Sequence, residues 1–241
     1  GDGPLAGEDR GHRERRGRHM TERERRKTIP PDRARGGIYP AAEDDDQDDG
    51  LDQVYEPAED TYLLLAAALE EVDPQDLVLE VGCGRGVISR SLAPRARRVI
   101  ATDLNPFALR SLRGRPGIEA VRADLFKGIG AGERARLDLV IFNPPYLPTE
   151  EDEVLKGWLN FAFDGGKTGR ETIDRFLEGL KDHLEPRRGR ALLLVSSLSD
   201  PAKVREKAEE EGLAVEVVAR EKHFFEELLV LRLTPRLSGT D

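Results

Sequence analysis

A run of polar and aromatic residues directly follows an apolar stretch in Asp138-Leu139-Val140-Ile141-Phe142-Asn143-Pro144-Pro145-Tyr146. Neither proline can donate a backbone hydrogen bond, so the chain should leave a buried strand rigidly at this point. Asn143 offers an amide oxygen, Pro144 a carbonyl with no internal partner, and Tyr146 a flat aromatic face. Two acceptors beside a ring suit a planar ligand with an NH2 group, such as a carboxamide or the exocyclic amine of a base. Taken alone, the motif is explained equally well by a strand that ends in a proline-rich turn.

A second candidate site is a glycine-rich loop, Glu80-Val81-Gly82-Cys83-Gly84-Arg85-Gly86, which follows an apolar stretch. Glycines let the backbone turn sharply and approach a ligand closely, and a helix start supplies free N–H groups. In the dinucleotide fingerprint the third glycine comes three residues after the second, whereas here it comes two residues later. The spacing therefore disfavours a nicotinamide-dependent oxidoreductase.

Acidic residues end or follow the next two expected strands. Asp103 could accept hydrogen bonds from both hydroxyls of a ribose. Asp124 could bind an adenine amino group, and Leu125 could cover its ring. Each acid alone could simply cap a helix or a turn. Because parallel strands end at one edge of a sheet, acids together with a glycine loop and Asn143 favour a nucleoside-containing cofactor there.

Apolar runs alternate with helical patterns and predict the elements that must position these residues. We expect a first helix that has Pro57 in its first turn, ends near residue 71 and has one face formed by Tyr62, Leu65, Leu69 and Val72. The expected strands cover residues 77–81, 99–103, 118–122, 137–142, 191–196, 213–219 and 228–233. The other expected helices cover residues 87–92, 106–112, 170–184 and 201–211. Residues 147–169 form either a rim over the site or a packed connector.

The last two expected strands are joined too briefly for a crossover helix, so they should be antiparallel. The whole pattern predicts an α/β fold, with a doubly wound, mostly parallel seven-stranded sheet and one antiparallel strand. We expect a disordered charged leader at residues 1–50, the domain at 51–235 and a tail at 236–241. Met20 is the only methionine, so we expect translation to start there and residues 1–19 to be non-native.

Composition narrows the class of protein further. The formal net charge is −9, and the acidic stretch at residues 43–60 accounts for it, so residues 61–241 carry little net charge. The single cysteine, Cys83, excludes an internal disulfide or a cysteine zinc site and fits a cytoplasmic location. No apolar run has the length of a membrane span, and no signal peptide pattern is present. The sequence thus predicts no membrane partner.

Together these motifs resemble class I S-adenosylmethionine-dependent methyltransferases, which have a Rossmann-like fold. Within them, the sequence is most similar to the HemK/PrmC group of glutamine N5-methyltransferases, in its archaeal and eukaryotic single-domain branch. The resemblance covers residues 54–233, and the long charged leader is a departure from it. The motifs that carry it are Tyr55-Glu56-Pro57-Ala58-Glu59-Asp60-Thr61, Glu80 to Gly86, Thr102-Asp103-Leu104-Asn105-Pro106, Asn143 to Tyr146, and Gly165-Gly166-Lys167-Thr168-Gly169-Arg170-Glu171.

The resemblance implies a role for each candidate residue. It places Asp103 on the ribose, Asp124 and Leu125 at the adenine, and Thr61 near the amino-acid end of the cofactor. The residues implied to line the methionine and ribose part are Glu80, Gly82, Gly84 and Gly86. Those implied to hold the substrate amide are Asn143, Pro144, Pro145 and Tyr146, with Asn143 also at the cofactor. No metal is implied.

The resemblance also implies a substrate and a partner. The family methylates the glutamine of a Gly-Gly-Gln loop in peptide-chain release factors, which act in translation termination. A small zinc-binding activator protein commonly adds a strand to the sheet edge in this branch, and Ile118–Arg122 is the candidate edge. The alternatives are methylation of adenine N6 in DNA or RNA, methylation of a protein lysine, and a nucleotide-binding module without catalysis. Residues 61–241 lack a basic excess, which counts against nucleic acid.

Overall fold

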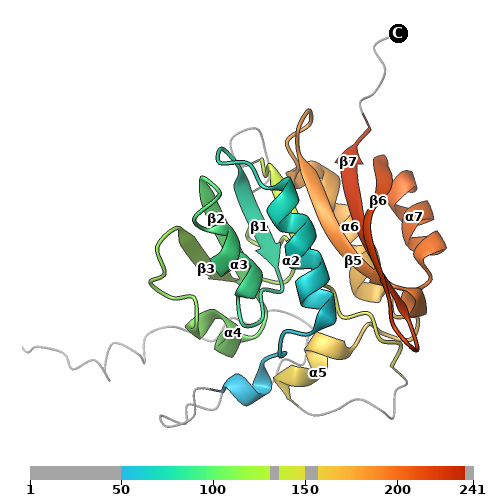
Figure 1. Ribbon diagram of the computed structural model, residues 1–241, viewed down its shortest axis with the longest axis horizontal. Helices are drawn as coiled ribbons and strands as arrows, with labels where there is room; N and C mark the ends of the chain where they lie inside the picture. Colours follow the sequence, from blue (N-terminus) through green and yellow to red (C-terminus); the bar gives the residue numbers. More distant parts are fainter. Residues whose placement is uncertain (1–49, 131–135, 150–156, 237–241) are drawn as a thin grey trace, which may run out of the picture. The chain divides into compact units, whose positions relative to one another are not determined.

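The computed structural model describes residues 50–130, 136–149 and 157–236, so the charged leader lies outside the described residues. The described strands form a seven-stranded sheet in the order β3-β2-β1-β4-β5-β7-β6 (Figure 1). Their bounds are β1 Leu77–Val81, β2 Arg98–Asp103, β3 Ile118–Arg122, β4 Leu139–Phe142, β5 Arg190–Ser196, β6 Leu213–Lys222 and β7 Glu227–Pro235. β1 to β5 pair in parallel, and β7 is antiparallel to both β5 and β6. The predicted doubly wound sheet with one antiparallel strand is confirmed.

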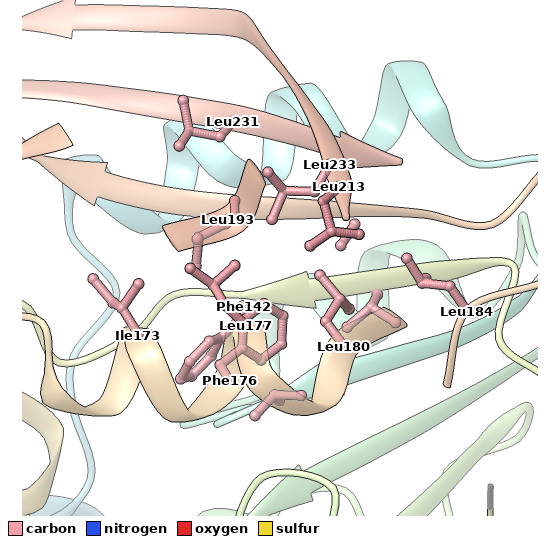
Figure 2. Close-up of a cluster of buried hydrophobic side chains, with 14 of the residues drawn as sticks. Phe142, Ile173, Phe176, Leu177, Leu180, Leu184, Leu193, Leu213, Leu231 and Leu233 are labelled. Carbon is pink, nitrogen blue, oxygen red and sulfur yellow. The ribbon is translucent and has the colours of Figure 1, made fainter. Parts of the chain in front are cut away.

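Helices pack on both faces of this sheet because its central strands are apolar on both sides. Leu139 and Ile141 of β4 join a core cluster with α2 (Glu59–Glu71) and α3 (Val87–Leu92). Val140 and Phe142 join a second cluster with α6 (Glu171–His183) and α7 (Pro201–Glu210). Figure 2 shows the second cluster, with the apolar face of α6 against the strands. The helices are η2 Leu51–Gln53, α2 Glu59–Glu71, α3 Val87–Leu92, α4 Pro106–Arg110, α5 Trp158–Phe163, α6 Glu171–His183, η3 Ser197–Ser199 and α7 Pro201–Glu210.

The carboxyl ends of the parallel strands lie in register at one edge, which we call the carboxyl edge. Val81 of β1 pairs with Thr102 of β2 and with Phe142 of β4, and Asp103 pairs with Arg122 of β3. Asp103 is therefore the last residue of β2, and the glycine loop and Asn143 directly follow the neighbouring strands β1 and β4. The sheet brings the predicted site residues together without help from any long loop.

The first helix differs from the prediction in its start and in its buried face. α2 begins at Glu59 with Ala58 as its N-cap, so Pro57 precedes the helix instead of lying in its first turn. Tyr62 was expected on the packed face, but 56% of it is exposed, and Leu64 is fully buried instead. The helix is rotated because Asp60 and Thr61 point into the protein, where they form hydrogen bonds.

The other differences concern element ends. α4 stops at Arg110, β4 begins at Leu139, and β6 and β7 extend to Lys222 and Pro235. Leu137, expected to start β4, instead forms an isolated bridge with Leu184. Within residues 147–169, for which the sequence suggested a rim or a connector, α5 forms at Trp158–Phe163.

Candidate active site

The glycine loop turns through left-handed backbone conformations directly after β1. Gly82, Gly84 and Gly86 have φ values of 63°, 50° and 70°, a region that other residues rarely adopt. The loop is closed by a hydrogen bond from the Gly86 N–H to the Cys83 carbonyl at 2.7 Å. At Gly84 a Cβ atom would meet nothing nearer than the Tyr55 carbonyl at 3.9 Å. The open space beside Gly84 is therefore available to a ligand that approaches the backbone.

Asp103 fixes the glycine loop against the end of β2. One carboxylate oxygen accepts from the Gly84 N–H at 2.9 Å, and the other accepts from the Asn105 N–H at 2.8 Å. Burial raises the pKa of Asp103, and these backbone donors only partly offset the effect. Each carboxylate oxygen can accept a further hydrogen bond, so the predicted contact with a ribose is compatible with these bonds.

Glu80 is a buried carboxyl group next to the glycine loop. It accepts hydrogen bonds from the backbone and the hydroxyl of Ser89 and forms no salt bridge with any described residue. Burial raises the pKa of Glu80 to about 8, although the hydrogen bonds from Ser89 lower it in part. A positively charged ligand would stabilise the ionised form of a buried acid that has no salt bridge.

Asn143 is oriented by Asp60, a residue that the sequence analysis did not single out. The Asn143 Nδ2 donates to Asp60 Oδ2 at 3.0 Å, and a carboxylate can only accept, so the NH2 end of the amide must face Asp60. The opposite end, Asn143 Oδ1, is buried and has no hydrogen-bond partner among the described residues. Buried polar atoms are almost always paired in native proteins, so an unpaired one at this edge indicates a ligand donor.

Asp60 also binds Tyr55 and Thr61. The Tyr55 hydroxyl lies 3.0 Å from both Asp60 oxygens, and the Thr61 N–H donates to Oδ1 at 2.6 Å. Burial, followed by the negative charge of Asp60, raises the pKa of both Tyr55 and Tyr146, so both remain neutral phenols. Thr61, predicted at the amino-acid end of the cofactor, is held in this same network. Asp60 therefore couples the start of α2 to the residues that follow β4.

The two prolines hold the residues after Asn143 away from the sheet. Pro144 is buried, Pro145 and Tyr146 are partly buried, and no described residue donates a hydrogen bond to the Pro144 carbonyl. The two acceptors predicted from the sequence, the Asn143 amide oxygen and the Pro144 carbonyl, are thus both without a partner within the described residues. The Tyr146 ring packs partly against the core cluster that includes α2.

The glycine motif at residues 165–171 packs against the backbone of residues 146–149. Gly165 donates to the Leu147 carbonyl at 3.0 Å, and Thr149 donates to the Gly166 carbonyl at 3.0 Å. Gly169 lies so close that a Cβ atom there would be 2.6 Å from the Tyr146 carbonyl. The motif therefore acts through the backbone, by fixing the position of the residues that follow Asn143.

Asp124 and Leu125 follow β3, as predicted, at the same edge. Burial alone would raise the pKa of Asp124, but hydrogen bonds and positive charge from Lys127 and Arg175 outweigh it and lower the pKa. An adenine amine would have to share the carboxylate with these two cations, so the adenine role of Asp124 stays a prediction. Leu125 has a φ of 51°, and such strained backbone in a non-glycine residue is often found at functional sites.

The described residues give no sign of a metal site or a membrane span. Their His, Cys, Asp and Glu side chains do not gather in groups of three that could hold a metal ion. None of their helices combines the length and the apolar composition that crossing a membrane requires.

A doubly wound sheet with a glycine loop after β1, an acid at the end of β2 and a polar site after β4 is the arrangement of class I methyltransferases, which are S-adenosylmethionine-dependent. The chain belongs to the family described as Methyltransferase small domain, which it matches over residues 59–225.

Three similar proteins narrow the comparison. A putative protein N5-glutamine methyltransferase of Methanocaldococcus jannaschii is 42% identical over 185 residues, which cover 74% of this chain and 90% of the relative. Human methyltransferase HEMK2 is 37% identical over 193 residues, or 75% of this chain and 89% of the relative. A solved chain of the E. cuniculi Mtq2–Trm112 complex, which methylates the translation termination factor eRF1, is 34% identical with a TM-score of 0.62. The match covers 76% of this chain and 99% of the solved one.

Proposed function

We propose that the protein transfers a methyl group from S-adenosylmethionine to the side-chain amide nitrogen of a glutamine, in the Gly-Gly-Gln loop of a peptide-chain release factor. The observation that carries the proposal is the orientation of Asn143, whose Oδ1 is buried and unpaired because Asp60 binds the other end of the amide. A carboxamide NH2 group has two donors, and Asn143 Oδ1 and the Pro144 carbonyl are two acceptors. Relatives named release factor glutamine methyltransferase support the choice of substrate.

The residues at the glycine loop fit the cofactor. Gly82, Gly84 and Gly86 would lie along its methionine and ribose part, Asp103 would accept from the ribose hydroxyls, and Glu80 would face the positive end. Thr61 would lie near the amino-acid end, with Asp124 and Leu125 at the adenine. Two features of the structure support this fit, namely the open space beside Gly84 and the burial of Glu80 without a salt bridge to any described residue. A positively charged ligand would favour the ionised form of Glu80.

When bound, S-adenosylmethionine supplies an activated methyl group on a sulfonium centre, so the protein need not supply a nucleophile or a metal. An amide nitrogen is a poor nucleophile because its lone pair is delocalised into the carbonyl. Asn143 and Pro144 would hold both N–H bonds and so fix the direction of that lone pair. The same oxygens, together with the carboxylate of Asp60 behind Asn143, would stabilise the positive charge that grows on the nitrogen. The nitrogen must also lose one proton when it gains the methyl group. Since Tyr55 and Tyr146 stay neutral, neither serves as the base, so the proton would pass to water. The contribution of the protein would then be positioning and electrostatics.

Substitution of Asn143 tests the proposal. Asn143→Ala should lower methyl transfer to the release factor by at least about 100-fold, while calorimetry should show binding of S-adenosylmethionine within about threefold of wild type. Transfer at the wild-type rate would refute the assigned role.

Asn105→Ala is a matched control, because Asn105 lies at the same edge but both ends of its amide are bonded inside the protein. It should lower stability by about 1 kcal/mol through loss of a helix cap and leave methyl transfer nearly unchanged.

Adenine N6 methylation and lysine methylation are the rival activities, since an exocyclic amine or a lysine amine could meet the same two oxygens. The carboxylates of Asp60, Glu226 and Glu59 all act on Tyr146, and this negative surrounding disfavours the phosphates of a nucleic acid. Parallel incubations with labelled cofactor and either release factor or an oligonucleotide distinguish glutamine methylation from adenine methylation. Fragmentation of the labelled protein by mass spectrometry distinguishes glutamine methylation from lysine methylation.

We further propose that a small zinc-binding activator protein adds a strand to the sheet beside β3, and that the enzyme works in the cytoplasm with the translation machinery. β3 is at the end of the strand order and pairs only with β2 among the described strands, so its outer side offers free backbone groups. The Mtq2–Trm112 complex supports a small partner for this kind of enzyme. Co-expression and co-purification with the host's candidate partner would test it, and equal activity and yield without the partner would contradict it.

A further inference from the structure

Large apolar side chains are exposed at only one part of the described surface. Five large apolar residues are exposed within the described residues, and all five lie at the carboxyl edge. We call them the apolar rim: Tyr62, Leu147, Leu198, Phe224 and Phe225. The opposite edge of the sheet has no exposed large apolar residue within the described ranges. Single exposed apolar residues are common, but their restriction to one edge indicates an interaction surface.

Two rim residues directly follow site residues in the chain, and the other three lie where β5 ends and β7 begins. Tyr62 follows Thr61 in the first turn of α2, and Leu147 follows Tyr146. Leu198 lies in η3, immediately after β5. Phe224 and Phe225 lie in the turn between β6 and β7, where Leu228 pairs with Ser196 at the end of β5. In Figure 1 this turn is at the same lower edge as the start of α2.

The most exposed part of the rim is held in place rather than free. Phe224 is 93% exposed and Phe225 is 88% exposed, and their rings meet edge to face with centroids 4.8 Å apart. The Ser196 hydroxyl donates to Glu226 at 2.5 Å, and the Glu227 N–H donates to the Ser197 hydroxyl at 3.0 Å. These bonds join the turn to the end of β5. Two aromatic side chains are therefore presented to solvent in a fixed position, which is costly unless they bind something.

The depth of the site indicates what binds. Asn143 Oδ1 is buried, so a substrate side chain must reach inward while the body that carries it stays outside. That body would meet the carboxyl edge, and aromatic residues are the ones enriched in interfaces between proteins. The carboxylates of Glu59, Asp60 and Glu226 around Tyr146 disfavour a nucleic acid at this edge.

We infer that the apolar rim is the docking surface for the folded protein that carries the target glutamine, with Phe224 and Phe225 as its main anchors. This inference depends on the proposed function, because it requires a protein substrate whose surface beside the glutamine is apolar. The rim would set affinity for the whole substrate, whereas Asn143 and Pro144 would set the chemistry on the amide. Recognition of the protein and recognition of the amide are thereby separated in space.

The double variant Phe224→Ser, Phe225→Ser tests the inference, because both side chains are in solvent and their loss should leave the thermal unfolding midpoint unchanged. Two substrates are compared, the intact release factor and a short peptide that contains only the Gly-Gly-Gln loop. For the intact protein, KM should rise on the order of 30-fold, as for loss of an interface hot spot, with kcat nearly unchanged. For the peptide, kcat/KM should stay within about twofold of wild type. Arg187→Ser, which changes an exposed residue at the opposite edge, should alter neither the KM for the intact protein nor the kcat/KM for the peptide.

Three results would overturn the inference. One is an unchanged KM for the intact protein. Another is an equal loss of kcat/KM for the intact protein and for the peptide, which would place the Phe224 and Phe225 rings in the catalytic pocket. A third is a wild-type dimer that becomes a monomer in the variant without a change in KM, which would make the rim a contact between copies of this chain. Failure of the proposed function is distinguishable, because wild-type enzyme would then methylate neither the intact factor nor the peptide.

Discussion

Replacement of Asp60 by asparagine should reverse the orientation of the Asn143 amide. Asp60 accepts hydrogen bonds from Tyr55, from Thr61 and from Asn143 Nδ2. Asparagine at position 60 keeps one oxygen, which the Thr61 N–H at 2.6 Å would retain, and places an NH2 group toward Asn143. Asn143 would then turn its own oxygen toward that NH2 group and present its NH2 to the substrate. The NH2 group of Asn143 would then face the NH2 group of the substrate glutamine, which needs an acceptor at that place.

The size of the effect follows from the loss of one oriented acceptor. Removal of a single donor or acceptor from a preorganised site costs about 10²- to 10³-fold in rate. We therefore expect kcat/KM for the release factor to fall by about 100-fold or more in Asp60→Asn. The free energy of unfolding should fall by only about 1 to 3 kcal/mol, because the network is rearranged rather than removed.

A second variant isolates the orientation from other effects. In Asp60→Asn combined with Asn143→Asp, the carboxylate at position 143 accepts from the amide at position 60 and still offers an oxygen to the substrate. The double variant should be at least about tenfold more active than Asp60→Asn, whereas Asn143→Asp alone should be poor because two carboxylates would meet. Wild-type activity in Asp60→Asn, or no recovery in the double variant, would show that Asp60 does not set the orientation of Asn143. The assay is transfer of labelled methyl to intact release factor, with cofactor affinity measured separately.

Two further predictions concern the supports of the site. Burial raises the pKa of Glu80 from its ordinary value of 4.5 to about 8, so the protonated form favours the folded state and this advantage is lost as pH rises through 8. Relative to Glu80→Gln, the ligand-free wild type should therefore lose about 4 kcal/mol of unfolding free energy between pH 4.5 and 8.5. Denaturation at several pH values measures this, and the same pH dependence of the unfolding free energy in both proteins would contradict it. Gly169→Ala would place a Cβ atom 2.6 Å from the Tyr146 carbonyl, whereas Gly128 has a similar positive φ with nothing within 4 Å. Gly169→Ala should thus lower both the unfolding midpoint and kcat/KM, whereas Gly128→Ala should lower only the midpoint. An equal loss of kcat/KM in both variants would show that the close approach of Gly169 to the Tyr146 carbonyl does not matter for activity.

The sequence predicted the sheet and most of the site because both depend on local pattern. Apolar runs define the strands, and each strand ends at a glycine, an acid or a proline, so the residues of the carboxyl edge follow from the strand ends. The structure shows Asp103 as the last residue of β2, and the glycine loop and Asn143 directly after β1 and β4, as that argument requires. Their contacts with cofactor and substrate stay predictions.

The sequence could not identify Asp60, because its role depends on a partner 83 residues away. It stands in an acidic stretch where it is indistinguishable from solvated neighbours, and only the rotation of α2 shows that it is buried. The same rotation exposes Tyr62, which helical spacing alone placed on the packed face. The exposed pair at Phe224 and Phe225 was also missed, since apolar residues next to a strand normally indicate core.

The central claim is that Asn143 aims a glutamine amide at the methyl donor. The most direct measurement is mass spectrometric fragmentation of the release factor after incubation with the enzyme and S-adenosylmethionine. We expect one methyl group on the side-chain nitrogen of the Gly-Gly-Gln glutamine, and at least about 100-fold slower transfer with Asn143→Ala. An unmodified release factor, a methyl group on a lysine, or methylation of the glutamine at an equal rate by Asn143→Ala would show that Asn143 does not have this role.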